Sequence, residues 1–213
     1  MNKGQIIVLF HHVFLMLGLF AYGFNIWYAL IIFFASMLWA WQVGSNVMHF
    51  GFAHKRYKDT LKNKFFALLT LVTGLGSPLS FVASHRQHHK YSDTEKDPHS
   101  PDHIGWKRVY FLDWEPQSIN PRMLKDWITS KFQKKLHKNF FYYHCLLVII
   151  AFIIDPRLLF FVVSPFVVYT FHVGSLQNTL PHMGGVVKNV PIMALIAPWA
   201  WRHGDHHLSL IHI

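Results

Sequence analysis

The sequence predicts an all-α integral membrane protein with four transmembrane helices, paired as two hairpins, below a histidine-rich cap. Three observations predict this fold class. The 213 residues are 52% hydrophobic and 17% aromatic, yet they carry a formal net charge of +10. Charged side chains are almost absent from two long stretches, residues 4–54 and 139–187, and 17 histidines lie mainly in a few short segments. An ordinary soluble domain of this length does not hold so much apolar sequence in uninterrupted blocks.

Residues 4–54 form the first predicted hairpin. They include no Asp, Glu, Lys or Arg, and a helix rising ~1.5 Å per residue over this length crosses a ~30 Å hydrocarbon core twice. The two helices are expected to divide near Gly23 and Asn25. The apolar stretch is too long for a cleavable signal peptide and lacks a small-residue cleavage site.

Residues 139–187 form the second predicted hairpin. Their only charged side chains, Asp155 and Arg157, flank Pro156, which predicts a tight turn between two helices. The first of these helices, residues 140–154, is short for a membrane span, and snorkelling of Lys138 would extend it.

The distribution of positive charge predicts the orientation. Lys and Arg are concentrated in residues 55–64, after the first hairpin, and in residues 122–138, before the second. Both segments, and with them both termini, are therefore expected on the cytoplasmic side. The chain is treated as one domain, residues 1–213, because the polar middle is too short for a separate compact unit.

Residues 65–83 are apolar enough to be mistaken for a further span. A single crossing there would place His54 and His85 on opposite faces of the membrane. Gly74, Gly76 and Pro78 interrupt any straight helix in this segment. We therefore expect it to be interfacial or re-entrant.

Three histidine clusters are the candidates for chemistry. Composition alone would produce one H-x2-H-H motif in roughly one chain of ten, whereas this chain holds two. On an α-helix, with ~100° per residue, three histidines so spaced fall within an arc of roughly 100° and can face one cavity. Histidines five apart lie about 140° from each other and would more naturally address two neighbouring metals, which indicates a dinuclear centre. The clusters are His49 with His54, then His85, His88 and His89, and then His203, His206 and His207.

The residue types leave the metal open. Imidazole ligands are compatible with iron, zinc, copper or nickel. Cys145 stands alone in a predicted span, so a structural zinc site with thiolate ligands is not favoured. An all-histidine site at a membrane surface suits redox chemistry on a lipid-soluble substrate.

The segments "HFGFAH", "HRQHHKYSDTEKDPH" and "HGDHH" resemble the three histidine boxes of the integral membrane fatty acid desaturases. The second segment is the most specific, because in that family H-x2-H-H is commonly followed by a basic residue, an aromatic residue, Ser-Asp-Thr and then Asp-Pro-His. Asn178-x3-His182 also resembles a family element between the last span and the third box.

The resemblance implies a di-iron centre that uses O2 to place a cis double bond in an acyl chain. Asn178 would reach a metal through water, and Asp93, Glu95 and Asp97 are candidates for carboxylates that orient the imidazoles. The acyl substrate would be linked to CoA or to a lipid. The implied iron ligands are His49, His54, His85, His88, His89, His182, His203, His206 and His207.

The sequence departs from the family pattern in two boxes and at its end. His49-Phe50 stands where many acyl-CoA desaturases have His-Arg, and the third box reads Trp201-Arg202-His203-Gly204-Asp205. The ending "LSLIHI" resembles translated sequencing-adapter sequence, which predicts a truncated reading frame and gives His212 no role.

Partners follow from charge and from the residues present. The basic segments suit anionic lipid headgroups or an acidic electron carrier. With one cysteine and no visible electron-transfer domain, the electrons are expected from a separate donor such as a ferredoxin or a cytochrome b5-type carrier. Nucleic acid is not an expected partner of a chain this apolar.

Two alternatives remain open at this point. One is a histidine-box hydroxylase or ketolase acting on an alkane, sterol or carotenoid. The residues of the second box favour desaturation over this alternative. The other is a metal-transporting membrane protein, which would be expected to place ionisable groups at mid-membrane depth.

Overall fold

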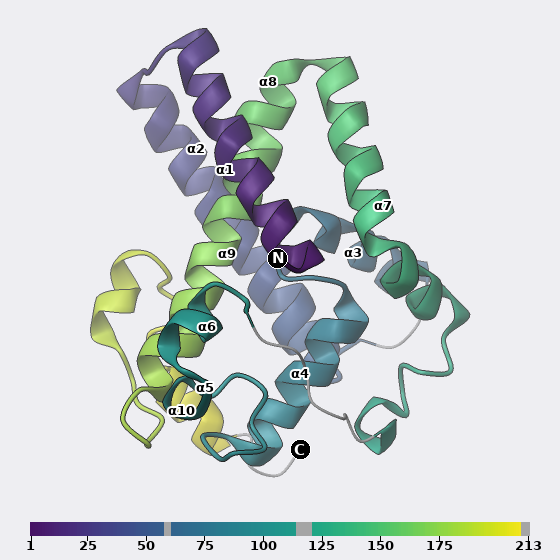
Figure 1. The fold of residues 1–213 in the computed structure, drawn as a ribbon, viewed down its shortest axis with the longest axis vertical. Coiled ribbons are helices and arrows are strands. Elements are labelled where there is room, and N and C mark those ends of the chain that lie inside the picture. The colour runs from purple at the N-terminus through teal and green to yellow at the C-terminus, as the bar shows by residue number, and fades with distance from the viewer. Residues whose placement is uncertain (58–60, 114–120, 210–213) are drawn as a thin grey trace.

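A computed structural model describes residues 1–57, 61–113 and 121–209, with the side chains of residues 61 and 62 left undescribed. Within these ranges the chain forms helices and turns and no strand. Four of the helices are long and apolar enough to cross a membrane (Figure 1). The predicted all-α membrane architecture is therefore confirmed.

The first hairpin consists of α1 (Lys3–Tyr22) and α2 (Ile26–Trp39), and α2 continues directly into a π-helix, η1 (Ala40–Ala53). Asn2 and Gln5 close a capping box at the start of α1. Gly23 then turns the chain with a φ of 78°, and the Asn25 side chain caps α2. The expected division of the two spans is at this turn.

The second hairpin consists of α7 (Lys131–Ile154), the single turn α8 (Pro156–Leu158), a short π-helical segment η4 (Leu159–Val163) and α9 (Ser164–Thr179). The Asp155 side chain accepts a hydrogen bond from the Arg157 amide, which forms the expected tight turn. The expectation of a short first span is wrong. Because Ser130 caps α7, the helix begins at Lys131 and reaches 24 residues.

The apolar segment between the hairpins is broken, as expected. It comprises α3 (Leu61–Leu69), the 3₁₀ turn η2 (Thr70–Val72) and α4 (Pro78–Tyr91). Gly74 and Gly76 separate the two halves with φ of 70° and 83°. The run from α3 through η2 rises roughly 18 Å at 1.5 Å per residue, too little for a ~30 Å hydrocarbon core.

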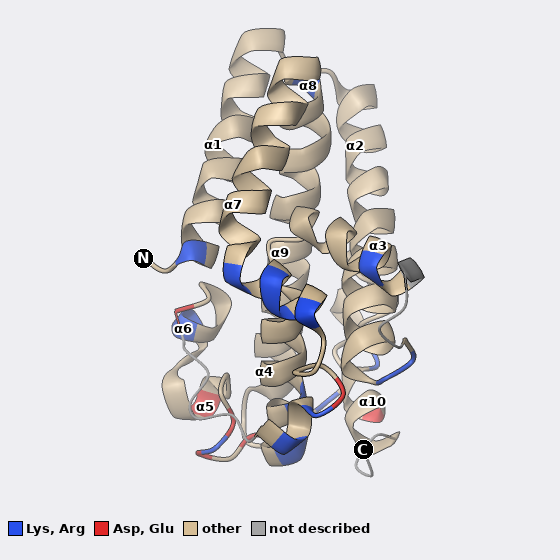
Figure 2. Ribbon diagram, turned by 90° about the vertical axis from the view of Figure 1, so that its right-hand side faces the viewer, with Lys and Arg blue, Asp and Glu red and all other residues tan. Residues whose placement is uncertain are grey.

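The cap lies at the end of the bundle away from the two hairpin turns (Figure 1). It contains α4 together with short helices, and Lys and Arg gather in a band across the starts of α1, α7 and α3 and on the cap (Figure 2). The upper part of the bundle is nearly free of charge, which agrees with a membrane surface at the level of this band. The short helices are α5 (Pro101–Ile104), α6 (Trp106–Tyr110), η3 (Pro121–Leu124), η5 (Leu180–His182), η6 (Pro191–Leu195) and α10 (His203–Ser209).

A buried apolar cluster joins the cap to the spans. It includes Phe52 of η1, Val82 of α4 and Leu136 of α7, each at most 1% exposed. This packing fixes the end of η1 against α4, the two elements that carry the first two histidine clusters.

Candidate metal centre

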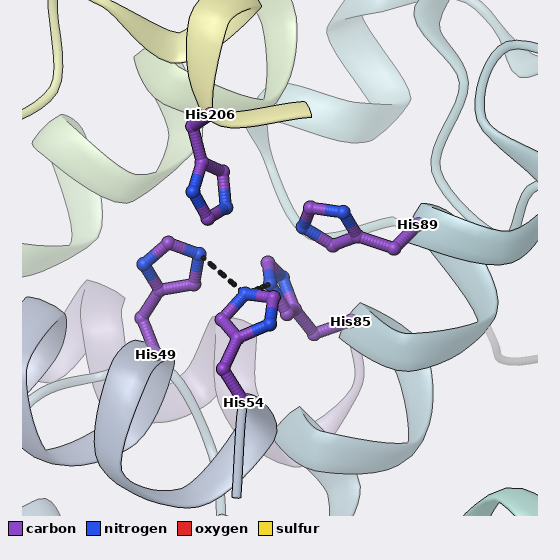
Figure 3. Close-up of side chains that lie close together, drawn as sticks. All are labelled: His49, His54, His85, His89 and His206. Atoms are coloured by element: carbon purple, nitrogen blue, oxygen red, sulfur yellow. Dashed lines mark hydrogen bonds between the residues drawn. The ribbon is translucent and has the colours of Figure 1, made fainter. Parts of the chain in front are cut away.

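Five histidines form the first of two groups, here called the upper group. Their nearest ring nitrogens all lie within 4.8 Å of one another, and the side chains converge from three elements (Figure 3). His54 Nε2 lies 3.2 Å from His49 Nε2 and 3.1 Å from His85 Nε2. The members are His49, His54, His85, His89 and His206.

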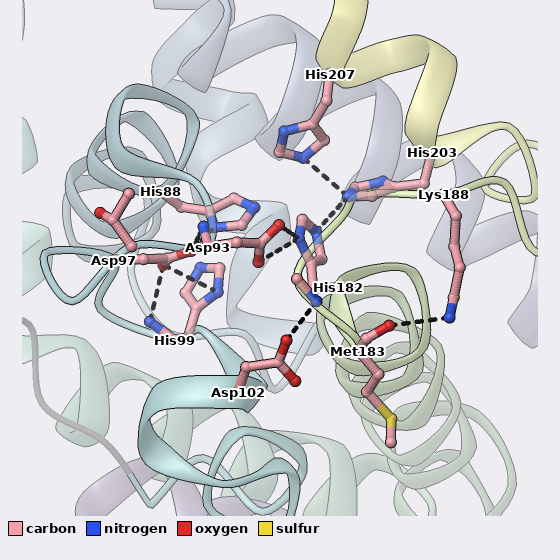
Figure 4. Close-up of polar contacts among 12 residues, drawn as sticks. His88, Asp93, Asp97, His99, Asp102, His182, Met183, Lys188, His203 and His207 are labelled. Atoms are coloured by element: carbon pink, nitrogen blue, oxygen red, sulfur yellow. Dashed lines mark hydrogen bonds and ion pairs between the residues drawn. The ribbon is translucent and has the colours of Figure 1, made fainter.

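Four further histidines form the lower group, and each of them is buried. His203 Nε2 lies 3.0 Å from His182 Nε2 and 3.1 Å from His207 Nε2 (Figure 4). The two groups touch, because the rings of His89 and His207 stack with centroids 4.2 Å apart. The members of the lower group are His88, His182, His203 and His207.

The backbone of η1 explains why His49 and His54 share a group. The His54 amide donates to the His49 carbonyl at 3.1 Å, an i→i+5 bond that brings residues five apart onto one side of the helix. The expectation that the two would address different metals assumed α-helical geometry and is wrong.

The histidines of α4 divide between the groups. His85 and His89 enter the upper group, whereas His88 enters the lower group. The three histidines therefore do not share one group, because His88 lies on the opposite side of His85 from His89 around the helix.

Two acidic side chains orient histidines of the lower group. His88 Nδ1 donates to Asp97 Oδ2 at 2.8 Å, and His182 Nδ1 donates to Asp93 Oδ1 at 3.1 Å. These bonds leave Nε2 of each ring with its lone pair directed into the group. Glu95, the third candidate, is exposed instead.

Burial and the neighbouring imidazoles favour the neutral form of His85, His206 and His207 by lowering their pKa. Desolvation, aided by nearby histidines, lowers the pKa of His207 to about 3 and that of His85 well below its ordinary value. Desolvation also lowers the pKa of His206 to about 4 and raises the pKa of the Asp97 carboxyl to about 6. Neutral imidazole is the form that binds a metal ion.

The donor set fits two metal ions. In both groups, ring nitrogens facing one another are 3.0–3.2 Å apart, and two ligands at right angles around a metal with ~2.1 Å bonds lie about 3 Å apart. The buried Nε2 atoms of His88, His89 and His206 have no hydrogen-bond partner among the described residues. Buried polar atoms usually have a hydrogen-bond or metal partner, and a metal ion in each group would provide one.

A small cavity of about 60 Å³ adjoins both groups. Its lining includes His49 and His85 from the upper group and His88 and His203 from the lower. Asn178, half-buried on α9, also lines it. Space for a small molecule is thus present beside both sets of ring nitrogens.

Other histidines lie outside the two groups, and several tie the spans together. His11 bonds to His144 and Ser164 at 2.9 Å, which links α1 to α7 and α9. His12 contacts His172 at 3.0 Å. The His99 amide donates to Asp97 Oδ1 at 3.0 Å, beside the lower group. His212 lies outside the described residues.

Sequence reasoning missed two further contacts. Gln177 Nε2 lies 3.1 Å from His203 Nδ1, and Arg86, inside the second cluster, is buried against the end of η1. Neither residue type signals such a role by its spacing, because both contacts join segments distant in sequence.

Comparison with known proteins identifies several desaturases among the relatives. The chain is 26% identical over 165 residues to the icosanoyl-CoA 5-desaturase of Limnanthes douglasii, covering 67% of this chain and 44% of that protein. It is 26% identical over 183 residues to the acyl-CoA C20 Delta5-desaturase of Anemone leveillei, covering 76% and 55%. It is 29% identical over 148 residues to the sn-1 stearoyl-lipid 9-desaturase of Synechocystis sp., covering 62% and 45%.

No family model matches the chain. The aligned regions span about half the length of these curated relatives. Their names agree with the histidine clusters and the four candidate spans, and the chain is similar to fatty acid desaturases over about two thirds to three quarters of its length.

Proposed function

We propose that this chain is the metal-binding membrane portion of an O2-dependent fatty acyl desaturase that places a cis double bond in an acyl chain. The observation that carries the proposal is the convergence of nine histidines into two adjoining groups, in which the ring nitrogens of neighbouring residues approach to about 3 Å. The relatives' names supply the reaction class.

Each group would hold one iron ion. The ligands of one iron would be the five histidines of the upper group, and those of the other the four histidines of the lower group. Asn178, at the cavity beside both groups, would reach a metal through water. Bound iron would supply the O2 chemistry needed to remove hydrogen from unactivated methylenes, which side chains alone do not perform.

The chain's own residues would prepare the site for this chemistry. Asp93 and Asp97 hold the tautomer and direction of His182 and His88. The small cavity would admit one segment of an acyl chain and exclude bulk water. Its apolar lining includes Leu75, Phe81 and Val173. Because an acyl chain has no polar group along its methylenes, the position of the double bond would be set by how deep the chain enters.

The substrate would be an acyl group linked to CoA or to a lipid, and electrons would come from a separate carrier. The band of Lys and Arg at the base of the bundle (Figure 2) supports a cytoplasmic metal cap with both termini on that side. The same charges favour anionic lipids and an acidic electron donor.

The test is fatty acid methyl ester analysis of membranes from a host that expresses the chain, beside the His88→Ala variant. The expected result is a new monoene in the first case and none in the second, with both proteins inserted in the membrane. His137→Ala is a matched control, since His137 bonds to Ser77 and lies outside both groups. Wild-type turnover and full iron content in His88→Ala would overturn the ligand assignment.

A further inference from the structure

Arg86 is a buried cation whose donors are all satisfied. Its side chain is 8% exposed, although it lies between two candidate ligands in the second histidine cluster. Nε donates to the carbonyl of Ala53 at 2.8 Å, and Nη2 donates to that of Phe52 at 3.2 Å. Nη1 donates to the Met123 carbonyl at 2.6 Å, and the two Nη atoms hold the Asp126 carboxylate at 2.6 and 2.8 Å. Five N–H groups thus meet five acceptors, the full capacity of a guanidinium.

The two backbone acceptors on η1 are the last carbonyls before His54. Carbonyls at the end of a helix have no partner within it, and a cation there is favoured by the helix dipole. Arg86 therefore closes the end of the π-helix. His54 follows at once with a φ of −91° and ψ of 23°, and Lys55 takes a φ of 59°, so the chain turns sharply beside the bond made by Arg86.

The contact joins the two elements that build the upper group. Three of its five histidines lie on η1 or α4, and a fourth, His54, directly follows η1. His54 and His85 flank the contact, and their Nε2 atoms are only 3.1 Å apart. The lower group takes a single histidine from these elements, His88. A change in how η1 meets α4 would therefore displace ligands of the upper group and leave most of the lower group in place.

We propose that Arg86, held by Asp126, is a positioning residue that sets the metal affinity of the upper group and not of the lower group. The inference rests on the proposed function, because it takes the two groups as metal sites. Asp126 fixes the plane of the guanidinium by a bidentate pair, and burial of the charge without this partner would be costly. The guanidinium also lowers the pKa of the Asp126 carboxyl, so the pair stays ionised.

Lysine at position 86 is the informative substitution. It retains the positive charge but offers three donors from one point, which cannot reach two backbone carbonyls and a bidentate carboxylate together. A purely electrostatic role would survive Arg86→Lys, whereas a role that depends on the planar fork would not. Asp126→Asn is a milder second variant, since it leaves Arg86 and its bonds to η1 intact.

The experiment measures ferrous iron binding by anaerobic equilibrium dialysis of the full chain in detergent micelles. The wild type is expected to bind two irons. Arg86→Lys is expected to weaken one of them about tenfold to a hundredfold, the range typical of partners that orient ligands, and Asp126→Asn to weaken the same one less. Arg157→Lys is the matched control, because Arg157 forms an exposed pair with Asp155 at the far turn.

Two ligand variants identify which iron is affected. In a His203→Ala background, which removes a lower-group ligand, the remaining iron should bind about tenfold to a hundredfold more weakly when Arg86→Lys is added. In a His206→Ala background, which removes an upper-group ligand, the remaining iron should be retained. Equal weakening in both backgrounds, or none in either, would overturn the positioning role. A wild type that binds no iron would instead refute the proposed function itself.

Discussion

Replacement of Asp97 by Asn is expected to weaken metal binding in the lower group. Three N–H donors converge on this carboxylate, whose side chain is 0% exposed. His88 Nδ1 and the Asp93 amide reach Oδ2 at 2.8 and 3.0 Å, and the His99 amide reaches Oδ1 at 3.0 Å. An asparagine side chain offers one acceptor oxygen, and its NH2 group would face at least one of these donors.

The size of the loss follows from the number of donors left without an acceptor. A buried donor left without an acceptor costs about 1–3 kcal/mol. If the oxygen that accepts from His88 Nδ1 is the one replaced, the His88 ring is free to rotate or to change tautomer. Its Nε2 atom is then no longer held pointing into the lower group. Loss of such an orienting partner lowers metal affinity about 10- to 100-fold, equivalent to roughly 1.4–2.8 kcal/mol.

The assay is an anaerobic ferrous iron titration of Asp97→Asn beside Asp113→Asn. Asp113 is the matched control because it forms an exposed pair with Arg108, with the carboxylate side chain 64% exposed. One of two irons should bind more weakly in Asp97→Asn, and both should bind normally in Asp113→Asn. Unchanged affinity for both irons in Asp97→Asn would refute the reasoning, as would equal loss from both groups.

Three further outcomes are expected. Gly74→Ala should lower the free energy of unfolding by about 1–2 kcal/mol or more, because a left-handed backbone costs that much for a residue with a Cβ and the new Cβ would lie 3.1 Å from Val167 Cγ1. Thermal unfolding measures the loss, and an unchanged unfolding midpoint would contradict the reasoning. The metal-free protein should lose stability as the pH falls from 7 to 5. Folding lowers the pKa of His206 to about 4 and that of His207 to about 3, from about 6.5 in the unfolded chain, so the unfolded state binds more protons in this range. The raised pKa of Asp97 acts in the opposite direction for one group only, and an unfolding midpoint that stays flat or rises as the pH falls would contradict the prediction. Removal of iron by a chelator should lower the unfolding midpoint of the loaded protein, because the metal binds the folded state; a midpoint that does not respond to chelation and reloading would argue against resident metal.

Much of the fold could be predicted from the sequence because a membrane imposes strong local rules. Charge-free runs and the turn residues Gly23 and Pro156 located both hairpins, and Gly74 and Gly76 located the break between them. The start of α7 was misplaced because the lysines of its first turns look like a loop. Once Ser130 caps the helix, these exposed lysines can lie on its polar face beside the membrane.

The site was predictable as a set of residues and not as an arrangement. Spacing alone selects the members of three clusters, whereas His182 stands alone and was identified only by resemblance. The π-helical path of η1 could not be read from the pattern, because H-x4-H is consistent with several backbones and the i→i+5 path closes against Arg86 of a distant element. The role of Asp93 likewise depends on its φ of 57°, a turn conformation that Asp tolerates.

Each H-x2-H-H motif divides its histidines between the two groups, and the two motifs divide them in opposite ways. On α4 the i, i+4 pair His85 and His89 enters the upper group and His88 enters the lower. On α10 the i, i+4 pair His203 and His207 enters the lower group and His206 enters the upper. In an α-helix, residues i and i+4 lie about 40° apart, while residue i+3 lies about 60° to the other side of i.

Each helix therefore spreads its three rings over about 100°, enough to serve two adjoining groups from one face. An extended strand would send neighbouring side chains to opposite faces, so the same spacing would serve only one group. Because each helix contributes to both groups, neither group can be assembled without both helices, and the two motifs act as reciprocal halves of one centre. The stacked rings of His89 and His207, one from each helix and each in a different group, lie where the halves meet.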